Sequence, residues 1–290
     1  MNNKQVYGKV KDPLFSILVP SWNNIAYLKV CVDSIRKNST YPHQIIVHVN
    51  DGSDGTLEWV REQQIDHTQS EGNIGICHAL NAASALSVTD YISYMNDDMY
   101  VLPDWDAHLF TEIRNIGHLD FFLSATMIEP RKNGNDPNII SPQDYGDISG
   151  NFEEEKLLKE YKDFPMNDWS GASWPPNVVH RSIWEAVGGY SVEFSPGLYS
   201  DPDFSMKLWK HGVRVFKGLG KSRVYHFMSK SLNRIELNDG RSQFMKKWGI
   251  TPGYLYRSML KMGMPWKGRL KEPFKGIAYG ISKWKAGKII

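Results

Sequence analysis

The sequence predicts an α/β protein with a mostly parallel central sheet flanked by helices, followed by a helical, basic C-terminal extension. Three observations support this fold class. Short apolar runs alternate with segments of helical periodicity over the first 115 residues, the runs end in polar, turn-forming residues, and basic residues dominate the end of the chain. Alternating strands and helices imply parallel strands joined by helical crossovers that cover both faces of the sheet.

The composition is that of an ordinary globular protein. Of the 290 residues, 41% are hydrophobic and 23% are charged. A chain of this length buries about three quarters of its unfolded surface, which excludes disordered, collagen-like and disulfide-scaffold classes. Cys31 and Cys77 are too few for a zinc ribbon and favour a reducing, cytoplasmic compartment. We expect no secretory signal, because residues 1–14 have no apolar core, and no membrane span, because no run of about 18 apolar residues occurs.

The first elements follow from apolar runs and capping residues. Residues 15–20 (FSILVP) form a short apolar run that ends at a proline and predicts a buried parallel strand. Asn23 or Asn24 can cap a helix over 25–37, where apolar residues recur at helical spacing. The next elements expected are a strand over 44–49, helices over 56–64 and 74–86, and a strand over 91–95.

Polar clusters follow three of these predicted strands, at 21–24 (SWNN), 50–54 (NDGSD) and 96–98 (NDD). The carboxyl ends of parallel strands meet at one edge of a sheet, and ligands of such sheets bind beyond that edge. The sequence therefore predicts a binding site at this edge.

The middle of the chain is less regular. Residues 129–150 are rich in Gly, Pro, Asn and Asp and predict a long loop, of the kind that often forms a lid or a binding segment. Asp201-Pro202 begins a helix expected to reach about His211, because proline suits a first helical turn. The other elements expected are a helix over 152–162, a strand leading into a helix over 178–189, and short strands near 213–217 and 222–226.

The charge is strongly divided along the chain. Residues 1–206 carry 14 Lys and Arg against 29 Asp and Glu, whereas residues 207–290 carry 20 against 3. Residues 241–290 contain 12 Lys and Arg interleaved with aromatic residues, and a single acid, Glu272. This composition suits peripheral contact with an anionic membrane, and it also suits a nucleic-acid surface or a solvated helical extension.

Two carboxylate motifs at strand ends have a functional and a structural interpretation. Adjacent Asp97 and Asp98 repel each other unless a cation such as Mg²⁺ or Mn²⁺ lies between them, although they can also form a solvated turn before the next helix. Asp51 can accept hydrogen bonds from a base or ribose, and its neighbours are equally the usual residues of a β-turn.

His226 ends a predicted strand in the basic half. A lone histidine is more often structural, but a neutral imidazole beside the carboxylates would be a good metal ligand. Ser229, Lys230 and Ser231 follow it and can donate hydrogen bonds to phosphate oxygens.

Asp201 and two tryptophans are candidates for the second half of a site. Asp201 is either a helix-capping residue or a carboxylate that serves as a general base. Trp169 and Trp174 lie in a loop-like stretch with Gly and Pro, and are either core residues or a platform on which a sugar stacks.

Six segments together resemble the family 2 glycosyltransferases, which have the GT-A fold. The resemblance covers about residues 15–230, and the motifs occur in the family's order. The segments are ILVPSWNN (17–24), VNDGSDGT (49–56), EGNIGICHALNAA (71–83), MNDDMYVLPDW (95–105), HRSIWEAVGGYSVEF (180–194) and YSDPDFSMKLWKHG (199–212). Trp22 stands at the family's tyrosine position, and Asn50 replaces the first Asp of the nucleotide-binding motif, which is also one residue shorter. Two departures matter for the site, since Asn96 replaces the first metal-binding Asp and Ser200 replaces a Glu.

The resemblance implies an inverting transfer of a hexosyl or N-acetylhexosaminyl group from a nucleoside diphosphate sugar, a UDP-sugar being favoured. The acceptor would be a hydroxyl of a glycan or glycolipid, as in polysaccharide biosynthesis, and Mn²⁺ or Mg²⁺ would bind the diphosphate through Asp98 and His226. Asp201 would be the catalytic base. The implied nucleotide-binding residues are Pro20, Ser21, Trp22, Asn23, Asp51, Asn73, Gly75, Asn81 and Asp97. The acceptor candidates are Trp169, Trp174 and Asp203.

We therefore expect a GT-A domain over 1–232, with a nucleotide-sugar half over about 14–115 and an acceptor half over about 116–232, and a basic helical extension over 233–290. We expect a cytoplasmic protein that can also contact the inner face of the membrane peripherally. No nucleic-acid partner is expected, because the basic residues lie apart from the motifs. A nucleotidyltransferase is an alternative, disfavoured because SWNN is not a glycine-rich basic loop, and so is a non-catalytic sugar- or nucleotide-binding module.

Overall fold

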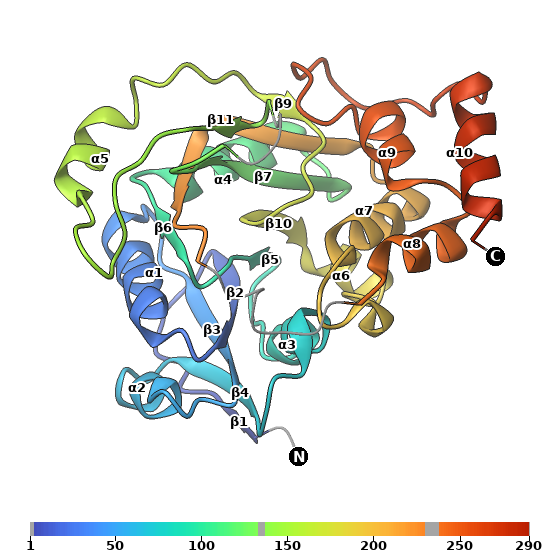
Figure 1. Ribbon diagram of the computed structural model, residues 1–290. Helices are drawn as coiled ribbons and strands as arrows, with labels where there is room; N and C mark the ends of the chain where they lie inside the picture. Colours follow the sequence, from blue (N-terminus) through green and yellow to red (C-terminus); the bar gives the residue numbers. More distant parts are fainter. Residues whose placement is uncertain (1–2, 133–136, 230–237, 290) are drawn as a thin grey trace.

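The computed structural model describes residues 3–132, 137–229 and 238–289. Over these residues the strands form a single eleven-stranded sheet, in the order β1-β4-β3-β2-β5-β10-β7-β11-β6, with β8 and β9 attached to β7 and β11 (Figure 1). Helices flank this sheet, so the expected α/β class is confirmed. None of the helices in the described part of the chain combines the length and the apolar character that crossing a bilayer requires.

The N-terminal half is the parallel part of the sheet. β2 pairs in parallel with β3 and β5, and β3 with β4, whereas β1 lies antiparallel on the edge. The strands are β1 (Asn3–Gln5), β2 (Phe15–Trp22), β3 (Gln44–Asn50), β4 (Asp66–Ser70) and β5 (Tyr91–Tyr94). The helices are α1 (Ile25–Asn38), α2 (Thr56–Glu62) and α3 (Gly75–Ser84).

Alternation of side chains along β2 explains why helices cover both faces. Leu18 belongs to the apolar cluster that includes Leu80 of α3, whereas Ile17 and Val19 belong to the cluster that includes Leu28 of α1. Successive strand residues point to opposite faces. Figure 1 accordingly shows α1 and α3 on opposite sides of the sheet.

Strand β4, which the sequence analysis does not predict, is made almost entirely of polar residues. It forms because it completes the ladder between β3 and β1, and because buried partners satisfy its side chains. His48 of β3, for example, lies 2.7 Å from the Thr68 hydroxyl and 3.2 Å from that of Ser70. Pairing between strands therefore decides this element, in the absence of an apolar pattern.

The start of α1 is capped differently from the expectation. The Asn24 side chain makes no capping hydrogen bond, and the backbone N–H of Ile25 donates instead to the Asp54 carboxylate at 2.9 Å. Asn24 turns away and donates to Asp97 at 3.1 Å. The carboxylate that stabilises the N-terminus of α1 thus comes from Asp54, in the loop after β3. The Asn24 side chain can therefore bind Asp97 instead.

The second half joins the sheet through β10, which lies antiparallel between β5 and β7. The strands here are β6 (Met99–Val101), β7 (Phe121–Ile128), β8 (Ile139–Ile140), β9 (Trp169–Ser170), β10 (Asn177–His180) and β11 (Val215–His226). The helices are α4 (Trp105–Ile116), α5 (Glu154–Glu160), α6 (Arg181–Ala186), α7 (Ser200–His211) and the short 3₁₀ turn η1 (Val192–Phe194).

The prediction of two short strands near 213–217 and 222–226 is wrong, because these residues form one continuous strand, β11 (Val215–His226). Its register against β7 shifts between Leu219 and Arg223, so a bulge interrupts the pairing without ending the strand. The apolar pattern of the sequence is interrupted at Gly218 and Gly220, where neighbouring atoms leave no room for a larger side chain. A Cβ on Gly218 would lie 1.9 Å from the Trp169 ring, and a Cβ on Gly220 would lie 2.1 Å from the Met166 carbonyl oxygen.

The C-terminal segment packs against α7. Trp248 donates its indole N–H to Asp203 at 2.8 Å, and the Lys247 ammonium lies 2.9 Å from the same carboxylate. Its elements are α8 (Gly240–Trp248), α9 (Pro252–Tyr254), the π-helical turn η3 (Leu255–Met259) and α10 (Ile277–Gly287). The expected domain boundary near residue 232 lies outside the described residues.

We expect Gly218→Ala to destabilise the fold, because the added methyl group overlaps the buried Trp169 ring. Overpacking of this kind costs about 1–3 kcal/mol, which denaturant unfolding would detect. Gly280→Ala in α10 is the matched control, since its Cβ meets no atom within 4 Å. A Gly218 variant as stable as the control would contradict this account of the bulge.

Candidate active site

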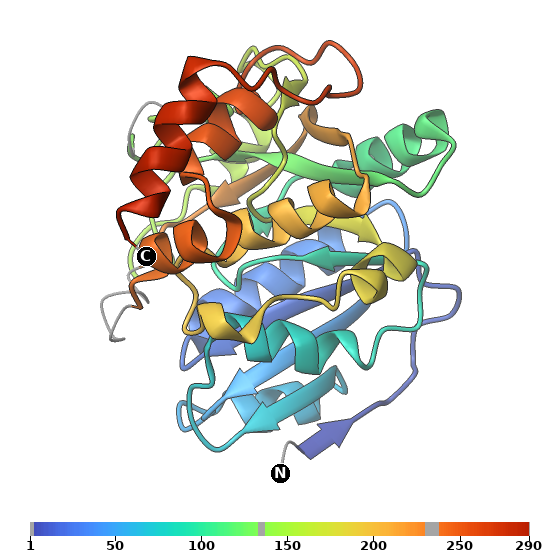
Figure 2. The ribbon, with the colours of Figure 1, turned by 90° about the vertical axis from the view of Figure 1, so that its right-hand side faces the viewer.

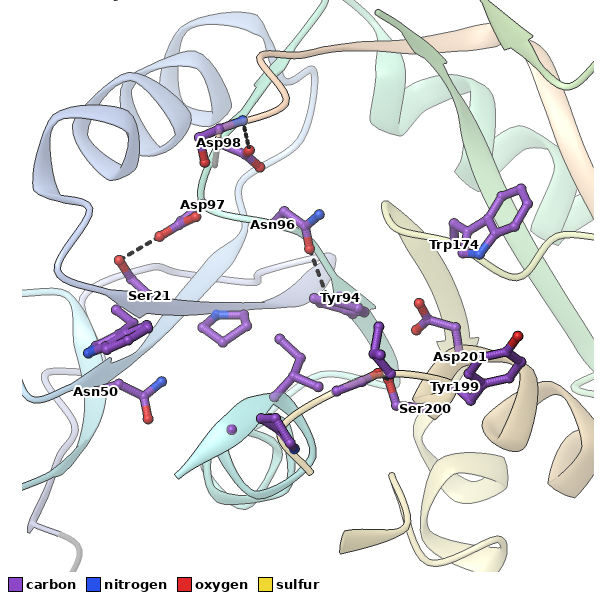
Figure 3. Close-up of a pocket in the computed structure, with 18 of the residues that line it drawn as sticks. Ser21, Asn50, Tyr94, Asn96, Asp97, Asp98, Trp174, Tyr199, Ser200 and Asp201 are labelled. Carbon is purple, nitrogen blue, oxygen red and sulfur yellow. Dashed lines mark hydrogen bonds between the residues drawn. The ribbon is translucent and has the colours of Figure 1, made fainter. Parts of the chain in front are cut away.

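A cavity of about 640 Å³ lies at the carboxyl ends of β2, β3 and β5, where the three polar clusters meet. Figure 3 shows Asp97 and Asp98 on one side of it, and Trp174 and Asp201 on the other. Both halves of the sheet and the C-terminal segment line it, the last through Tyr256. The predicted site residues that line this cavity are Pro20, Ser21, Trp22, Asn73, Gly75, Asp97, Asp98, Trp174, Asp201 and His226.

Asn23 and Asp51, two of the predicted nucleotide-binding residues, do not line the cavity. Asn23 donates to the Asp51 carboxylate at 2.9 Å and accepts from the Gly52 N–H at 3.1 Å, so the pair ties two loops together. The neighbouring Asn50 lines the cavity instead. Its side-chain oxygen accepts from the Ile74 N–H at 3.0 Å, which leaves the amide nitrogen as its donor toward a ligand.

Three further predicted residues make structural contacts away from the cavity. Asn81 forms a two-way clamp with the Tyr190 backbone, donating at 2.7 Å and accepting at 2.9 Å. Trp169 is buried against Gly218 and donates to Thr126 at 2.9 Å. Asp203 is fully buried and faces α8 rather than the cavity. These contacts place Asn81, Trp169 and Asp203 in the framework of the fold.

Asp97 is held by donors from the first loop. The Ser21 hydroxyl donates to it at 2.7 Å (Figure 3). The Asn24 amide donates to it at 3.1 Å. Asp97 therefore fixes the loop after β2 against the loop after β5, and both loops border the cavity.

Asp98 and His226 form a buried charged pair, with Glu129 behind the histidine. Nε2 of His226 lies 3.4 Å from Asp98, and Nδ1 lies 2.9 Å from Glu129. Burial opposes charge on both groups, but the facing charges outweigh it, so the pKa of Asp98 is lowered and that of His226 is raised to about 10. The backbone N–H of Ser229 also donates to Asp98 at 2.8 Å.

Glu129 is a site residue that the sequence analysis does not find. It follows β7, is 4% exposed and lies 97 positions from His226 in the sequence. A carboxylate on one imidazole nitrogen fixes the ring orientation and leaves the other nitrogen facing the site. Lys230 and Ser231, expected to donate to phosphate, lie outside the described residues.

Asn96, one of the two departures from the family pattern, is oriented by a tyrosine. The Tyr94 hydroxyl donates to its side-chain oxygen at 2.7 Å (Figure 3). Burial raises the pKa of Tyr94 well above its usual value, so the hydroxyl keeps its proton and remains the donor. The Asn96 amide nitrogen is then available to donate into the cavity, which an aspartate could not do.

Asp201 lies in the first turn of α7 and lines the cavity together with the preceding loop at 196–199. The hydroxyl of Tyr190, a residue buried behind the cavity, donates to it at 3.0 Å. Burial raises the pKa of Asp201 to about 7, while the Tyr190 hydrogen bond acts in the opposite direction. A carboxyl group with this pKa exchanges protons near neutral pH. Ser200, the second departure, donates to the Gly197 carbonyl at 2.7 Å and stabilises the preceding turn.

The residues around Asp98 fit a weakly held divalent cation. Within the described ranges, no three His, Cys, Asp or Glu side chains are grouped to hold a metal ion. Asp98 offers an oxygen donor, and His226 offers a nitrogen donor once a cation displaces the proton that its two facing carboxylates stabilise. Mg²⁺ or Mn²⁺ commonly completes such a set with water and substrate phosphate. The donor set therefore suits a cation that binds together with a diphosphate.

Residues 16–181 match the model of glycosyl transferase family 2. The chain belongs to this family. The predicted family is therefore confirmed, and with it the predicted enzyme class, a glycosyltransferase.

Several known proteins resemble this family member. Chondroitin synthase of Escherichia coli is 23% identical over 232 residues, which are 78% of this chain and 31% of that protein. The chain spans less than a third of the length of the first curated relatives that it matches.

Solved structures share the fold. TarS residues 1–349 of S. aureus, in complex with UDP-GlcNAc, align with a TM-score of 0.59 at 16% identity, over 81% of this chain and 65% of that one. GalNAc-T7 with UDP, GalNAc and Mn²⁺ aligns with a TM-score of 0.57 at 12% identity, over 83% of this chain and 51% of that one.

We expect Glu129→Gln to lower the pKa of His226, because one of its two facing carboxylates is lost. Loss of a close opposite charge shifts a pKa by about 1–3 units, which an NMR titration of the imidazole would resolve, with His226→Gln for assignment. Glu160→Gln is the control, since that carboxylate contacts Tyr145. An unchanged His226 pKa in Glu129→Gln would show that the contact does not exist in solution.

Proposed function

We propose that this chain is an inverting glycosyltransferase that moves a sugar from a nucleoside diphosphate sugar to a hydroxyl of a glycan or glycolipid. The observation that carries the proposal is a cavity with a buried carboxylate, Asp98, paired with His226 on one side and a carboxyl group of near-neutral pKa, Asp201, on the other. Asp98 can hold the cation that a diphosphate requires, and Asp201 can take the proton from an acceptor hydroxyl.

The nucleotide is proposed to bind beside β2 and β3. Trp22 and Asn73 border this end of the cavity, and the Asn50 amide can donate to a carbonyl of the base. A UDP-sugar is our favoured donor, which agrees with the UDP-GlcNAc and UDP bound in similarly folded proteins. Ser21 and Asp97 form the wall between the base and the diphosphate.

The diphosphate is proposed to bind in the cavity beside Asp98 and His226. These residues would hold Mn²⁺ or Mg²⁺, which supplies Lewis-acid stabilisation of the leaving diphosphate. Glu129 orients the His226 ring, and the Ser229 N–H fixes the second oxygen of Asp98. The chain thus provides a rigid, charged edge of the cavity where negative charge develops on the leaving group.

Asp201 is proposed to be the general base. Its carboxylate takes the proton from the acceptor hydroxyl while that oxygen forms a bond to the anomeric carbon. The bond from the anomeric carbon to the diphosphate oxygen breaks on the opposite face, and its electron pair leaves with the nucleoside diphosphate. Tyr190 holds the carboxylate in place through its hydrogen bond.

The acceptor is proposed to bind near Trp174 and Tyr256. Their rings are 5.8 Å apart, centroid to centroid, and both residues line the cavity on the side of Asp201. Aromatic rings provide flat apolar faces for the C–H surface of a sugar. Tyr256 belongs to the C-terminal segment, so that segment forms part of the proposed acceptor site.

We also propose a cytoplasmic enzyme of polysaccharide or glycolipid synthesis, held peripherally at an anionic membrane by residues 241–290. The composition of that segment supports the contact, since 12 Lys and Arg stand against a single acid.

Replacement of the base tests the chemistry directly. We expect Asp201→Asn to lower kcat by about 10²–10⁴-fold, because amide nitrogen cannot accept the acceptor proton. Nucleotide binding should be retained, since Asp201 lies across the cavity from the nucleotide end. Release of nucleoside diphosphate and calorimetric binding of UDP measure the two quantities. Full turnover in the variant would exclude Asp201 as the base, and absence of turnover by the unmodified protein on any donor would favour a non-catalytic binding module.

The raised pKa of Asp201 makes two effects of pH predictable. Activity should fall as pH decreases through about 7, because the base becomes protonated. Folding stability should respond in the opposite direction, since the ionised carboxylate destabilises the folded state. The Tm of Asp201→Asn should therefore exceed that of the unmodified protein. This difference in Tm should grow between pH 3.8 and about 7 and remain constant at higher pH. Equal Tm values at all pH values would contradict the buried environment.

Nucleotide binding is tested by thermal unfolding with nucleoside diphosphates, each with and without Mn²⁺ or Mg²⁺. At about 100 times its Kd a ligand adds roughly 2.7 kcal/mol to stability, so the Tm should rise by several degrees. We expect the rise with UDP to depend on the cation and to lose that dependence in Asp98→Asn. No rise with any nucleotide would contradict the proposed donor site.

A further inference from the structure

The outer face of α10 carries a row of large exposed apolar side chains. Phe274 precedes the helix and is 92% exposed, and the helical residues Ile277, Ile281 and Trp284 are 84%, 50% and 59% exposed. Residues 277, 281 and 284 follow the spacing i, i+4 and i+7, so they lie on one face. We call these four residues the apolar ridge. Figure 2 shows α10 at the periphery of the molecule.

The inner face of α10 is made of small residues. Ser282 and Ala286 are buried, and the Ser282 hydroxyl accepts from the Thr251 N–H at 2.8 Å. Tyr279 packs on Tyr254 with ring centroids 5.5 Å apart. The helix is therefore attached through small and aromatic residues, while its larger aliphatic residues face outward. This is the reverse of the usual arrangement of a surface helix, in which the apolar face is buried.

Cations border the apolar ridge. The lysines Lys275, Lys283, Lys285 and Lys288 are all exposed, and the Lys288 ammonium lies 3.7 Å from the centre of the Trp284 ring. The acid Glu272 is already engaged, because it accepts from the Trp209 indole at 3.1 Å and pairs with Arg214. The surface around the ridge is thus positively charged without a neutralising carboxylate from its own segment.

We propose that the apolar ridge inserts into the interfacial layer of an anionic bilayer while the bordering lysines bind lipid phosphates. This deepens the peripheral membrane contact of the proposed function by naming its surface and its mode of binding. Apolar residues at headgroup depth, with lysines that reach the phosphates, are the arrangement of interfacial helices. A contact driven by charge alone would not require Phe274, Ile277, Ile281 or Trp284 to be exposed.

Two other occupants fit the charge and the shape less well. A second copy of the chain, related by a twofold axis, would bring the same lysines against one another. Nucleic acid would pair with the lysines but would leave the aliphatic side chains of Ile277 and Ile281 without a complementary surface. An anionic bilayer satisfies both features at once.

The ridge is connected to the catalytic unit through packed helices. α10 packs on α8 and α9, and α8 packs on α7, whose first turn carries Asp201 (Figure 1). Docking through the ridge would therefore hold the cavity in a defined position relative to the bilayer. This would favour an acceptor anchored in the same bilayer.

The test is sedimentation of the full chain with vesicles of phosphatidylcholine, alone or with about 30% phosphatidylglycerol, at low and high salt. We expect binding to the anionic vesicles that weakens with salt, and a loss of at least about tenfold in affinity in the triple variant Ile277→Ser, Ile281→Ser, Trp284→Ser. Val88→Ser with Leu119→Ser is the matched control, since these apolar side chains are 61% and 46% exposed elsewhere. A Tm and a circular dichroism spectrum equal to those of the control variant verify that the triple variant is folded.

The outcomes separate the ridge from the rest of the proposed function. If the unmodified chain binds neither kind of vesicle, both the membrane contact and the ridge inference fail, whereas glycosyl transfer to a water-soluble acceptor is unaffected. If the triple variant binds as the control does, the contact is electrostatic and the ridge inference alone fails. A dimer in sedimentation velocity that the triple variant abolishes, without vesicle binding, would assign the ridge to a second copy and overturn the inference.

Discussion

The contact between Asp98 and His226 is the interaction on which the site depends, because it joins the loop between β5 and β6 to the end of β11. His226 ends β11 and pairs in register with Met99, the residue after Asp98, and Glu129 follows the adjacent strand β7. Three charged side chains from distant parts of the sequence thus meet at the ends of three neighbouring strands. Buried charges are tolerated only when they are paired and hydrogen-bonded. The pairing of β6, β11 and β7 is therefore also what keeps the Asp98 and His226 edge of the cavity assembled.

The sequence predicts the parallel half of the fold well, because its strands are apolar and its helices amphipathic. It does not predict β4, whose polar residues become strand only through their pairing with β3 and β1, and it divides β11 at glycines that exist to admit Trp169 and the Met166 carbonyl. Glu129 has no local signal either, since its partner is 97 positions away. Contacts between elements decide each of these cases, and a periodic pattern within one segment contains no information about them.

Asp201 and Asp203, which lie in a single helical turn, also have roles that the sequence alone does not distinguish. Both are aspartates at the start of α7, and the resemblance to the family assigns a site role to each. The structure gives Asp203 a cation, Lys247, and an indole donor, so its charge stabilises the attachment of α8. Asp201 accepts a hydrogen bond from the Tyr190 hydroxyl, and burial raises its pKa to about 7. Two neighbouring carboxylates therefore have different chemistry because of their partners, which the sequence does not reveal.

The division of charge along the chain has two physical consequences rather than one. Some cations of the C-terminal segment neutralise acids of the domain, as Lys247 does for Glu193 and Asp203, and this attaches the segment whose Tyr256 lines the cavity. The lysines around α10 are placed differently, since they border an apolar ridge on the outside of the molecule. A purely electrostatic attachment of the segment would need only the first group. The second group is combined with exposed aliphatic and aromatic side chains, and that combination is what favours a bilayer over a simple polyanion as the partner of this surface.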